Sequence, residues 1–374
     1  MVFSNFNRST RKPLVLVCPL DWGLGHTTRC IPLIRELLIQ GCAVVIGCNS
    51  TQKELFKQEF EDSVSYIHLA GYNIRYGKNR RSTFFKLMLQ SFKILIRIKR
   101  ENRWLRSFLT TQQVDGIISD NRFGLHAEGI PTVFITHQLQ IKTGLGKWAD
   151  GIVRRWNYGL IEHFTGCWVP DKAGEPSLSG ALSHPSQMPE LPIRYIGALS
   201  RLAPCPTPGN AGLLIILSGP EPLRSIFEQL LLEQLTHYNG QAIMVRGLPL
   251  STTLPAAPDH CRLLNHASAQ TLQSLICDAE LVISRCGYTT VMDLFSMQKK
   301  SILVPTPGQA EQEYLAHHLL QQQWAYTLPQ KGFQLERALE EAGKFMYKIP
   351  DLPMDGYKEA VREFVEGMNT GVSD

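Results

Sequence analysis

The feature that most constrains the fold is a series of short, continuous apolar runs separated by segments with helical periodicity. In the first half of the chain these runs occupy residues 14–20, 43–48, 65–70, 116–119, 132–136 and 166–170. Strands that are apolar on both faces are typical of a parallel sheet covered by helices on both sides. We therefore expect the first half to be a doubly wound α/β domain.

A second series of the same kind follows at residues 213–219, 242–247, 261–267, 280–285 and 300–305. The stretch between the two series, SRLAPCPTPGNAG, has the proline-rich composition of a linker. A chain of 374 residues is also long for one core. We expect an N-terminal α/β domain over residues 1–200, a linker over 201–212 and a second α/β domain over 213–350.

The C-terminal segment, residues 351–374, has the pattern of an amphipathic helix. Asp355 is a candidate N-cap, and apolar residues follow at helical spacing: Tyr357, Val361, Phe364, Val365 and Met368. Such a helix must bury one face. It either packs back on the N-terminal domain or closes its own domain, and the sequence leaves both arrangements open.

Charge is divided unevenly along the chain. Residues 1–200 contain 25 Lys and Arg against 15 Asp and Glu, whereas residues 201–374 contain 13 against 18. The two halves are therefore expected to face different partners, or to complement each other across a cleft.

Nine cysteines are present, and none of them forms a Cys-x-x-Cys pair. This argues against a zinc ribbon or a disulfide framework, and it predicts reduced, mostly buried thiols in a cytoplasmic protein. The early apolar run PLVLVCPL is too short to span a bilayer and is not followed by a signal-peptide cleavage region.

The first apolar run leads into the stretch DWGLGHTTR, which contains Gly23, Gly25 and His26. A dinucleotide site would need a third small residue here and an acid at the end of the second strand, and both are missing, so NAD is disfavoured. The glycines instead allow a tight turn into a helix N-terminus, where a ligand can approach the backbone. A neutral His26 at that edge of the sheet can act as a base, unless it only caps the helix.

A histidine that acts as a base needs a group to orient it. Asp120 directly follows the apolar run 116–119, at the same expected sheet edge, and could hold the second ring nitrogen of His26. Asp21 and His137 stand at equivalent strand ends. The sequence does not decide which of the three approaches His26, and we assign the catalytic pair to His26 and Asp120.

The stretch ISRCGYTTVMD has the pattern of a strand, a turn at Gly287 and a helix. Thr289 and Thr290 would lie at the helix N-terminus, where hydroxyl and N–H groups can bind phosphate. Asp293, one helical turn further, can accept hydrogen bonds from both ribose hydroxyls. A second phosphate loop is predicted at the strand end of residues 218–219, and the loop PTPGQAEQ provides polar side chains suited to sugar hydroxyls.

In this order and spacing, the segments resemble the nucleotide-binding motif of GT-B glycosyltransferases, closest to family 28 and more distantly to the UDP-glucuronosyltransferase type. The Gly-x-Gly-His turn also matches that family, in which the histidine is a candidate base for the acceptor hydroxyl. Asp293 stands where the family usually has Glu, so the identity of the sugar does not follow. The resemblance implies that the donor is bound by Gly25, Ser218, Gly219, Arg285, Gly287, Thr289, Thr290, Asp293, Gln309, Glu311 and Gln312.

The resemblance implies an α/β GT-B fold, in which two Rossmann-like, doubly wound domains face a cleft. The implied activity is metal-independent, inverting transfer of a hexose from a nucleotide-sugar, expected to be a UDP-sugar, to an acceptor hydroxyl. Helix N-termini and Arg285 would neutralise the leaving diphosphate, because no Asp-x-Asp motif for a metal occurs. We expect no cofactor, and a lipid-linked glycan is one option for the acceptor.

Two other functions fit the same chain. Arg29 completes a Gly-x-Gly-His-x-x-Arg pattern that resembles the UDP-sugar hydrolase of pseudaminic acid synthesis, in which water replaces the acceptor alcohol. The third option is a non-catalytic binder of an anionic membrane surface, because residues 75–106 contain eleven basic side chains against the single Glu101. One face of the expected helix would present Lys86, Lys93, Arg97 and Arg100.

This basic helix has a simpler explanation as well, a helix that packs on the sheet and leaves its charged face in water. The two explanations are compatible, because the same face could hold a transferase at the inner, cytoplasmic side of a membrane. We do not expect nucleic acid as a partner, because no recognised binding module is present.

Overall fold

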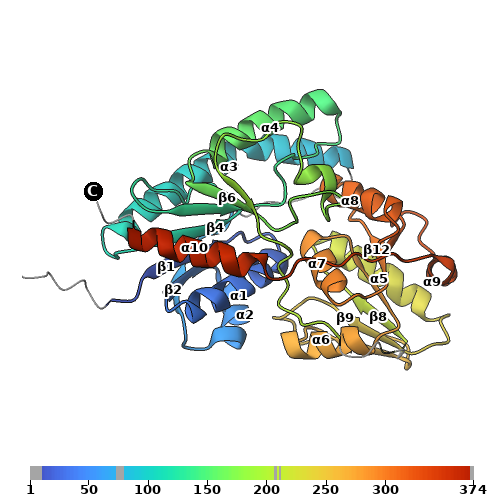
Figure 1. Cartoon of the computed structure of the whole chain (residues 1–374). Coiled ribbons are helices and arrows are strands. Elements are labelled where there is room, and N and C mark those ends of the chain that lie inside the picture. The colour runs from blue at the N-terminus through green and yellow to red at the C-terminus, as the bar shows by residue number, and fades with distance from the viewer. Residues whose placement is uncertain (1–10, 73–79, 206–208, 210–211, 371–374) are drawn as a thin grey trace, which may run out of the picture.

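The computed structural model describes residues 11–72, 80–205, 209 and 212–370, with the side chains of 80–92 and 369–370 left out. These residues form two α/β lobes that lie side by side, each built on a parallel sheet with helices on its faces (Figure 1). This is the fold class predicted from the apolar runs.

The N-terminal sheet has seven parallel strands in the order β3-β2-β1-β4-β5-β6-β7. Its centre is completely apolar: Val15, Leu16 and Val17 of β1 are fully buried, as expected for strands covered on both faces. The strands are β1 (Leu14–Pro19), β2 (Ala43–Cys48), β3 (Ser65–His68), β4 (Gly116–Asp120), β5 (Thr132–Ile135), β6 (Gly166–Val169) and β7 (Ile193–Tyr195).

The second sheet has six parallel strands in the order β10-β9-β8-β11-β12-β13. Both sheets therefore reverse their strand order once, between β1 and β4 and between β8 and β11. Ligands of open α/β sheets bind at such switch points, outside the carboxyl ends of the strands. The strands are β8 (Leu213–Ile216), β9 (Ala242–Val245), β10 (Cys261–Leu264), β11 (Leu281–Arg285), β12 (Ser301–Val304) and β13 (Tyr326–Thr327).

Helices connect the strands and cover both faces of the sheets. The N-terminal lobe contains α1 (Leu24–Ile39), α2 (Ser50–Phe60), α3 (Arg80–Leu109) and α4 (Lys147–Ile161). The second lobe contains α5 (Leu223–Leu235), α6 (Ala269–Asp278), α7 (Tyr288–Ser296), α8 (Ala310–Gln321) and α9 (Leu335–Lys344), and the last helix is α10 (Gly356–Thr370). Within the described part of the chain, no helix is long and apolar enough to cross a bilayer.

The last helix, α10, lies on the N-terminal lobe rather than on its own (Figure 1). It packs beside α1, and the ring of Phe364 meets Trp168 of β6 edge to face at 5.7 Å. Gly116 of β4 leaves room for this contact, because a Cβ there would lie 2.5 Å from the sulfur of Met368. Of the two arrangements that the sequence left open for this helix, the structure has the one in which it packs on the first domain.

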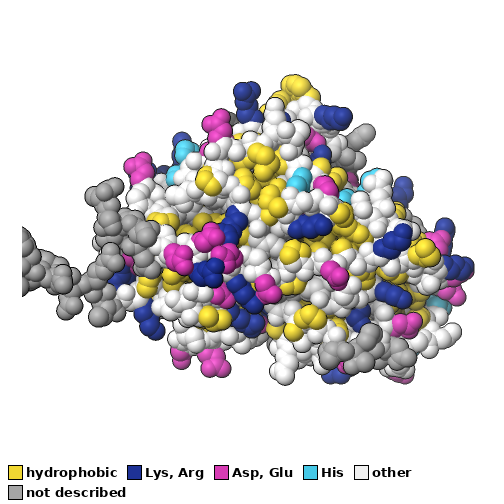
Figure 2. Space-filling model, in the orientation of Figure 1, with side chains coloured by type: hydrophobic (Ala, Val, Ile, Leu, Met, Phe, Trp, Pro, Cys, Tyr) yellow, Lys and Arg dark blue, Asp and Glu magenta, His cyan; other side chains and the backbone are white. Residues whose placement is uncertain are grey.

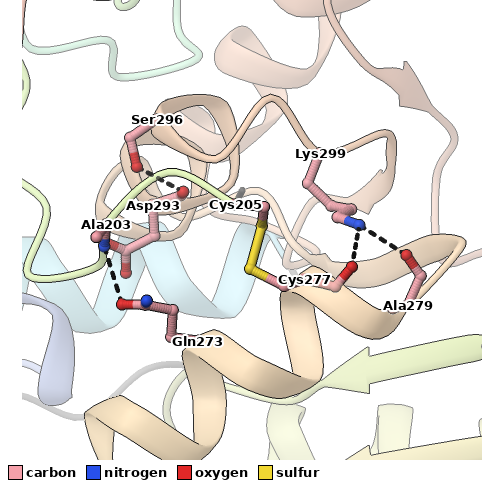
Figure 3. Close-up of a disulfide and its surroundings, with 8 residues drawn as sticks. All are labelled: Ala203, Cys205, Gln273, Cys277, Ala279, Asp293, Ser296 and Lys299. Atoms are coloured by element: carbon pink, nitrogen blue, oxygen red, sulfur yellow. Dashed lines mark hydrogen bonds between the residues drawn. A yellow bond between two sulfur atoms is a disulfide. The ribbon is translucent and has the colours of Figure 1, made fainter. Parts of the chain in front are cut away.

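The expectation that all cysteines are reduced is wrong for one pair. Cys205 and Cys277 form a disulfide, with Cα atoms 5.4 Å apart, that joins the linker to α6 (Figure 3). The two residues are 72 positions apart, so their spacing in the sequence carries no signal of the pairing. The other seven cysteines are free and buried, as predicted.

Removing the Phe364 ring should destabilise the protein, because α10 then loses its contact with Trp168. We expect Phe364→Ala to lower the free energy of unfolding by about 3 kcal/mol, measured by urea denaturation. Glu363→Ala on the exposed side of the same helix is the control, and it should change stability by less than about 1 kcal/mol. Equal losses in the two variants would contradict this packing.

Candidate active site between the two lobes

The two predicted motifs meet where the carboxyl edges of the sheets face each other. The hydroxyl of Thr289, at the N-terminus of α7, donates to the carbonyl oxygen of Gly25 at 3.3 Å. A side chain on Gly25 would not fit without a shift, because its Cβ would lie 3.0 Å from the Thr289 hydroxyl. The glycine therefore makes room for the close approach of α1 and α7.

A pocket of about 710 Å³, including space open to solvent, lies at this junction. It brings together Gly25 of α1, Ser218 after β8, and Thr289, Thr290 and Asp293 of α7. These five were all among the predicted donor-binding residues, although they come from both lobes. A mostly apolar pocket with a few convergent polar groups is the usual form of a small-molecule site.

Among the pocket residues that the sequence did not predict are two titratable ones, Arg201 and His266. Arg201 lies in the linker and pairs with Glu59 of α2 at 3.1 Å, but its Nε has no partner. His266 follows β10, and its Nε2 is also buried without a partner. Burial and the charge of Arg201 lower the pKa of His266. Each of these two lining residues thus has one nitrogen without a hydrogen-bond partner. The sequence pattern alone did not indicate that the two residues would meet at this pocket.

Asp293 lies in the pocket, and its carboxylate is bound by the residue that directly precedes the linker. The hydroxyl of Ser200 donates to Asp293 Oδ1 at 2.6 Å. Burial raises the pKa of Asp293 to about 6, against smaller opposing effects of Ser200 and Arg201. The ionised carboxylate is therefore under-solvated here, and hydroxyl groups of a ligand would supply the hydrogen bonds it lacks.

Two glycines of the predicted donor loops differ in backbone conformation. Gly219 has φ +105°, which favours glycine, but it does not line the pocket. Gly287 is the N-cap residue of α7, so the chain turns from β11 into the helix where the sequence predicted it. Its φ of −81° and ψ of 137° are an extended conformation that any residue adopts, so the turn does not require a glycine.

Arg285 does not take the position predicted for it. Its side chain is 1% exposed, lies 4.1 Å from the centre of the Phe227 ring, and donates to the carbonyl of Leu223 at 2.9 Å and to Gln330 Oε1 at 2.8 Å. Burial lowers the pKa of Arg285 to about 9. The guanidinium is directed into the second lobe and does not line the pocket, which does not fit the predicted role at the diphosphate.

The three polar residues predicted to bind the donor sugar, at the start of α8, make different contacts. Gln312 accepts from the backbone N–H of Thr306 at 2.8 Å and donates to Gln309 at 2.6 Å, so these two glutamines hold the loop together. Glu311 instead crosses to the other lobe, where its Oε1 lies 2.8 Å from Nε2 of His137. Of the three predicted sugar-binding residues, only Glu311 reaches the N-terminal lobe in this structure.

His26 lies beside Gly25, next to the pocket, in a buried group of charges. Its Nδ1 is 3.1 Å from Oδ2 of Asp120, which is completely buried. Burial lowers the pKa of His26, Asp120 opposes this effect and Arg29 adds to it. Asp21 binds the backbone N–H of Tyr72 at 3.0 Å instead. Asp120 is therefore the one of the three candidates that meets His26.

Arg29 is the centre of this group. Its guanidinium is bound to both carboxylate oxygens of Asp120, through Nε at 2.8 Å and through Nη2. Although burial alone would raise the pKa of Asp120, Arg29 and His26 hold it below its usual range. Arg29 Nη1 also lies 3.4 Å from Nδ1 of His137, whose ring stacks on Tyr288 of α7.

The predicted basic face on α3 can be described only in part. Lys93 and Arg100 are exposed and Arg97 is half-buried, while the side chain of Lys86 lies outside the described residues. The structure adds an exposed apolar stripe on α4 and the loop before it, which the sequence analysis missed. Its members are Leu145, Trp148, Ile152 and Trp156.

Two parallel, doubly wound lobes around a shared pocket define the GT-B fold, and comparison with solved structures agrees. The structure of the glycotransferase of kitacinnamycin has a TM-score of 0.62 at 13% identity and covers 97% of this chain and 95% of its own. A UDP-glucosyltransferase from Polygonum tinctorium has a TM-score of 0.60 at 13% identity, with coverages of 98% and 95%. MurG of Acinetobacter baumannii has a TM-score of 0.53 at 14% identity, with coverages of 96% and 99%.

Residues 265–363 match the model of the glycosyltransferase family 28 C-terminal domain. The chain thus has the GT-B fold, and its second lobe contains a segment similar to the family 28 C-terminal domain. It is 24% identical over 230 residues to the "UDP-N-acetylglucosamine--N-acetylmuramyl-(pentapeptide) pyrophosphoryl-undecaprenol N-acetylglucosamine transferase" of Synechocystis sp., 59% of each chain. It is 27% identical over 177 residues to an uncharacterised glycosyltransferase of Methanosarcina acetivorans, covering 43% of this chain and 42% of the relative. The matched part of the chain thus spans about three fifths of the length of the Synechocystis relative and about two fifths of the length of the Methanosarcina relative.

Asp293→Asn should stabilise the unliganded protein in a pH-dependent way. Because the folded-state pKa of about 6 lies above the ordinary 3.8, the stability that Asp293 contributes is lost as the pH rises through 6. An amide avoids this loss, so the variant should be more stable than wild type at pH 8 by up to about 3 kcal/mol, and the difference should shrink at pH 5. Urea denaturation at both pH values measures it, with exposed Asp259→Asn as control. A gain that is equal at both pH values would contradict the raised pKa.

Proposed function

We propose that this protein is a glycosyltransferase that moves a hexose from a nucleotide-sugar, expected to be a UDP-sugar, to an acceptor hydroxyl with inversion. The observation that carries the proposal is the pocket between the lobes, where the N-termini of α1 and α7 meet beside Asp293. Helix N-termini favour a diphosphate, and a half-buried carboxylate favours ribose hydroxyls. The name of the Synechocystis relative, a transferase that uses UDP-N-acetylglucosamine, supports a UDP-sugar.

The proposed donor site uses no metal. Thr289 and Thr290 offer hydroxyl and N–H groups to the diphosphate, and Arg201 is the cationic side chain that lines the pocket. The absence of an Asp-x-Asp motif from the sequence supports this part of the proposal. Two solved neighbours point to different pyrimidine donors, since one contains thymidine diphosphate and another UDP-2-fluoro-glucose. The test therefore includes both.

In the proposed reaction, His26 accepts the proton of the attacking hydroxyl. The ring must then carry its own proton on Nδ1, facing Asp120 at 3.1 Å, so that Nε2 is free. The lowered pKa keeps His26 neutral near pH 7, as a base requires. A base of this kind contributes about 10²- to 10⁴-fold in rate.

Hydrolysis of the same donor is the second candidate function. The observation that favours it is Arg29, which completes the Gly-x-Gly-His-x-x-Arg pattern and binds both Asp120 and His26. The acceptor would then be water, and the rest of the site would be unchanged. The product separates the two functions, because a hydrolase releases the free sugar at its full rate without an added alcohol.

The proposal includes a peripheral position at the cytoplasmic face of an anionic membrane, with a lipid-linked glycan as acceptor. On α4 and the loop before it, Trp148 is 82% exposed and lies on one stripe with Leu145, Ile152 and Trp156. Leu160 of α4 and Ile94 of α3 pack against the same apolar cluster, which includes Ile98 of α3, so the two helices belong to one side of the N-terminal lobe. Figure 2 shows apolar side chains among Lys and Arg over α4, at the top of the view. Exposed tryptophans flanked by basic residues suit a lipid interface.

A panel of UDP-, dTDP- and GDP-sugars in EDTA tests the donor site. We expect a UDP-sugar to stabilise wild type and His26→Ala equally, by about 2.7 kcal/mol at a hundred times the dissociation constant. Release of UDP in the absence of acceptor should fall about 10²- to 10⁴-fold in His26→Ala and stay unchanged in exposed His163→Ala. If no nucleotide-sugar raises the melting temperature, the proposed function fails.

Co-sedimentation with anionic liposomes tests the membrane surface. Wild type should bind at low salt and be released at high salt, because exposed charges are screened beyond about 10 Å at 0.1 M. Binding should weaken in Trp148→Ser with Trp156→Ser and in Lys93→Glu with Arg100→Glu. Met346→Ser, at an exposed apolar position in the segment that follows α9, should bind like wild type. Equal binding of all variants would contradict the proposed surface.

A further inference from the structure

The geometry points to Arg29 as a positioning residue that decides which ring nitrogen of His26 carries the proton. Nη2 of Arg29 lies 2.9 Å from Nδ1 of His26, closer than Oδ2 of Asp120 at 3.1 Å. An arginine side chain has donors only, so a bond from Arg29 requires a lone pair on Nδ1. An ionised aspartate can accept hydrogen bonds but cannot donate one, so a bond between His26 and Asp120 requires a proton on Nδ1.

These two requirements exclude each other, so the group can adopt two states. In the first, Arg29 donates to Nδ1 and the proton of His26 is on Nε2. In the second, Nδ1–H donates to Asp120, and Nε2 is free to accept the proton of a hydroxyl. The arrangement of Arg29 favours the first state at rest, because the fork that holds Asp120 also places Nη2 closer to Nδ1 of His26 than Asp120 Oδ2 is.

The position of Arg29 is held from several sides. Its side chain is 2% exposed, so water does not replace a lost bond. Nη1 lies 3.4 Å from Nδ1 of His137, which fits a lone pair there and an Nε2–H that donates to Glu311 at 2.8 Å. Arg29 thereby links His26 to a residue of the second lobe.

Several titratable groups act on His26, and the test must separate them. Arg29 belongs to its own helix, and Asp120 comes from β4. Cys30, also of α1, lies 3.8 Å from Asp120 through its sulfur. His137 and Glu311 act from the loop after β5 and from α8. Among these groups, Arg29 is the one that combines a positive charge with a bond to Nδ1. Its substitutions can therefore remove the charge and the bond together, or the forked geometry alone.

Histidine ¹⁵N NMR on the intact, unliganded protein is the direct test. In wild type we expect a neutral His26 with Nδ1 as the unprotonated nitrogen. In Arg29→Met, Asp120 loses its counter-charge, so His26 should bind a second proton and its pKa should rise by about one unit or more. Arg29→Lys keeps the charge without the fork, so the pKa should stay close to wild type while the proton moves to Nδ1.

Two further variants separate this role from a general loss of stability. Arg122→Met removes an equally buried arginine of the same lobe, paired with Glu101 at 2.6 Å, and should leave the titration of His26 unchanged. Arg29→Met with Asp120→Asn removes both charges and should reverse the rise in pKa. It also supplies the measurement if Arg29→Met alone does not fold.

The kinetic readout rests on the proposed function. In Arg29→Met the acidic limb of the pH profile of kcat/KM should move to higher pH by the same amount as the pKa of His26, with donor affinity unchanged. The inference is overturned if His26 titrates alike in wild type and Arg29→Met, or if Nδ1 carries the proton in wild type. Because the NMR measurement uses no donor, a protein that binds no nucleotide-sugar would refute the proposed function and leave this inference to its own test.

Discussion

The burial of an ionised carboxylate, Asp120, is the constraint on which the site depends. A charge without access to water is stable only when it is paired and hydrogen-bonded, and Arg29 meets this requirement with both arms of its fork. The pair fixes the start of α1 against the end of β4, the two elements that flank the switch point of the N-terminal sheet. His26 is then held beside the pair, and His137 extends the same group toward the second lobe.

The pocket depends equally on segments that belong to neither sheet. Arg201 of the linker lines it and pairs with Glu59, and Ser200, which directly precedes the linker, binds Asp293. The disulfide between Cys205 and Cys277 holds the next turn of the linker on α6, beside the Lys299 ammonium that binds the carbonyl of Cys277 (Figure 3). The polar groups of the pocket are therefore sensitive to how the lobes are oriented.

Arg285 and Arg201 show that a residue can match a sequence motif while a different residue of the same type lines the pocket. Arg285 stands at the position of the diphosphate arginine in the family pattern, yet its side chain lies on the Phe227 ring and binds carbonyls of its own lobe. Arg201, outside every motif, is the arginine in the pocket. A residue type at the right spacing fixes where the backbone passes, whereas the direction of a long side chain depends on the neighbours that pack around it.

The sequence by itself determined the two parallel sheets, because short apolar runs without alternation are typical of strands that are buried on both faces. It also located two turns that meet at the pocket, since their glycine and threonine residues follow the ends of β1 and β11 closely. It did not reveal β7 and β13, which have three and two residues and are defined only by pairing with a neighbour. Tertiary structure alone chose Asp120 over Asp21, joined Cys205 to Cys277 and turned Arg285 away from the pocket. Each of these outcomes depends on residues more than 40 positions apart in the sequence. Such contacts form only in the folded chain, so the local sequence pattern does not predict them.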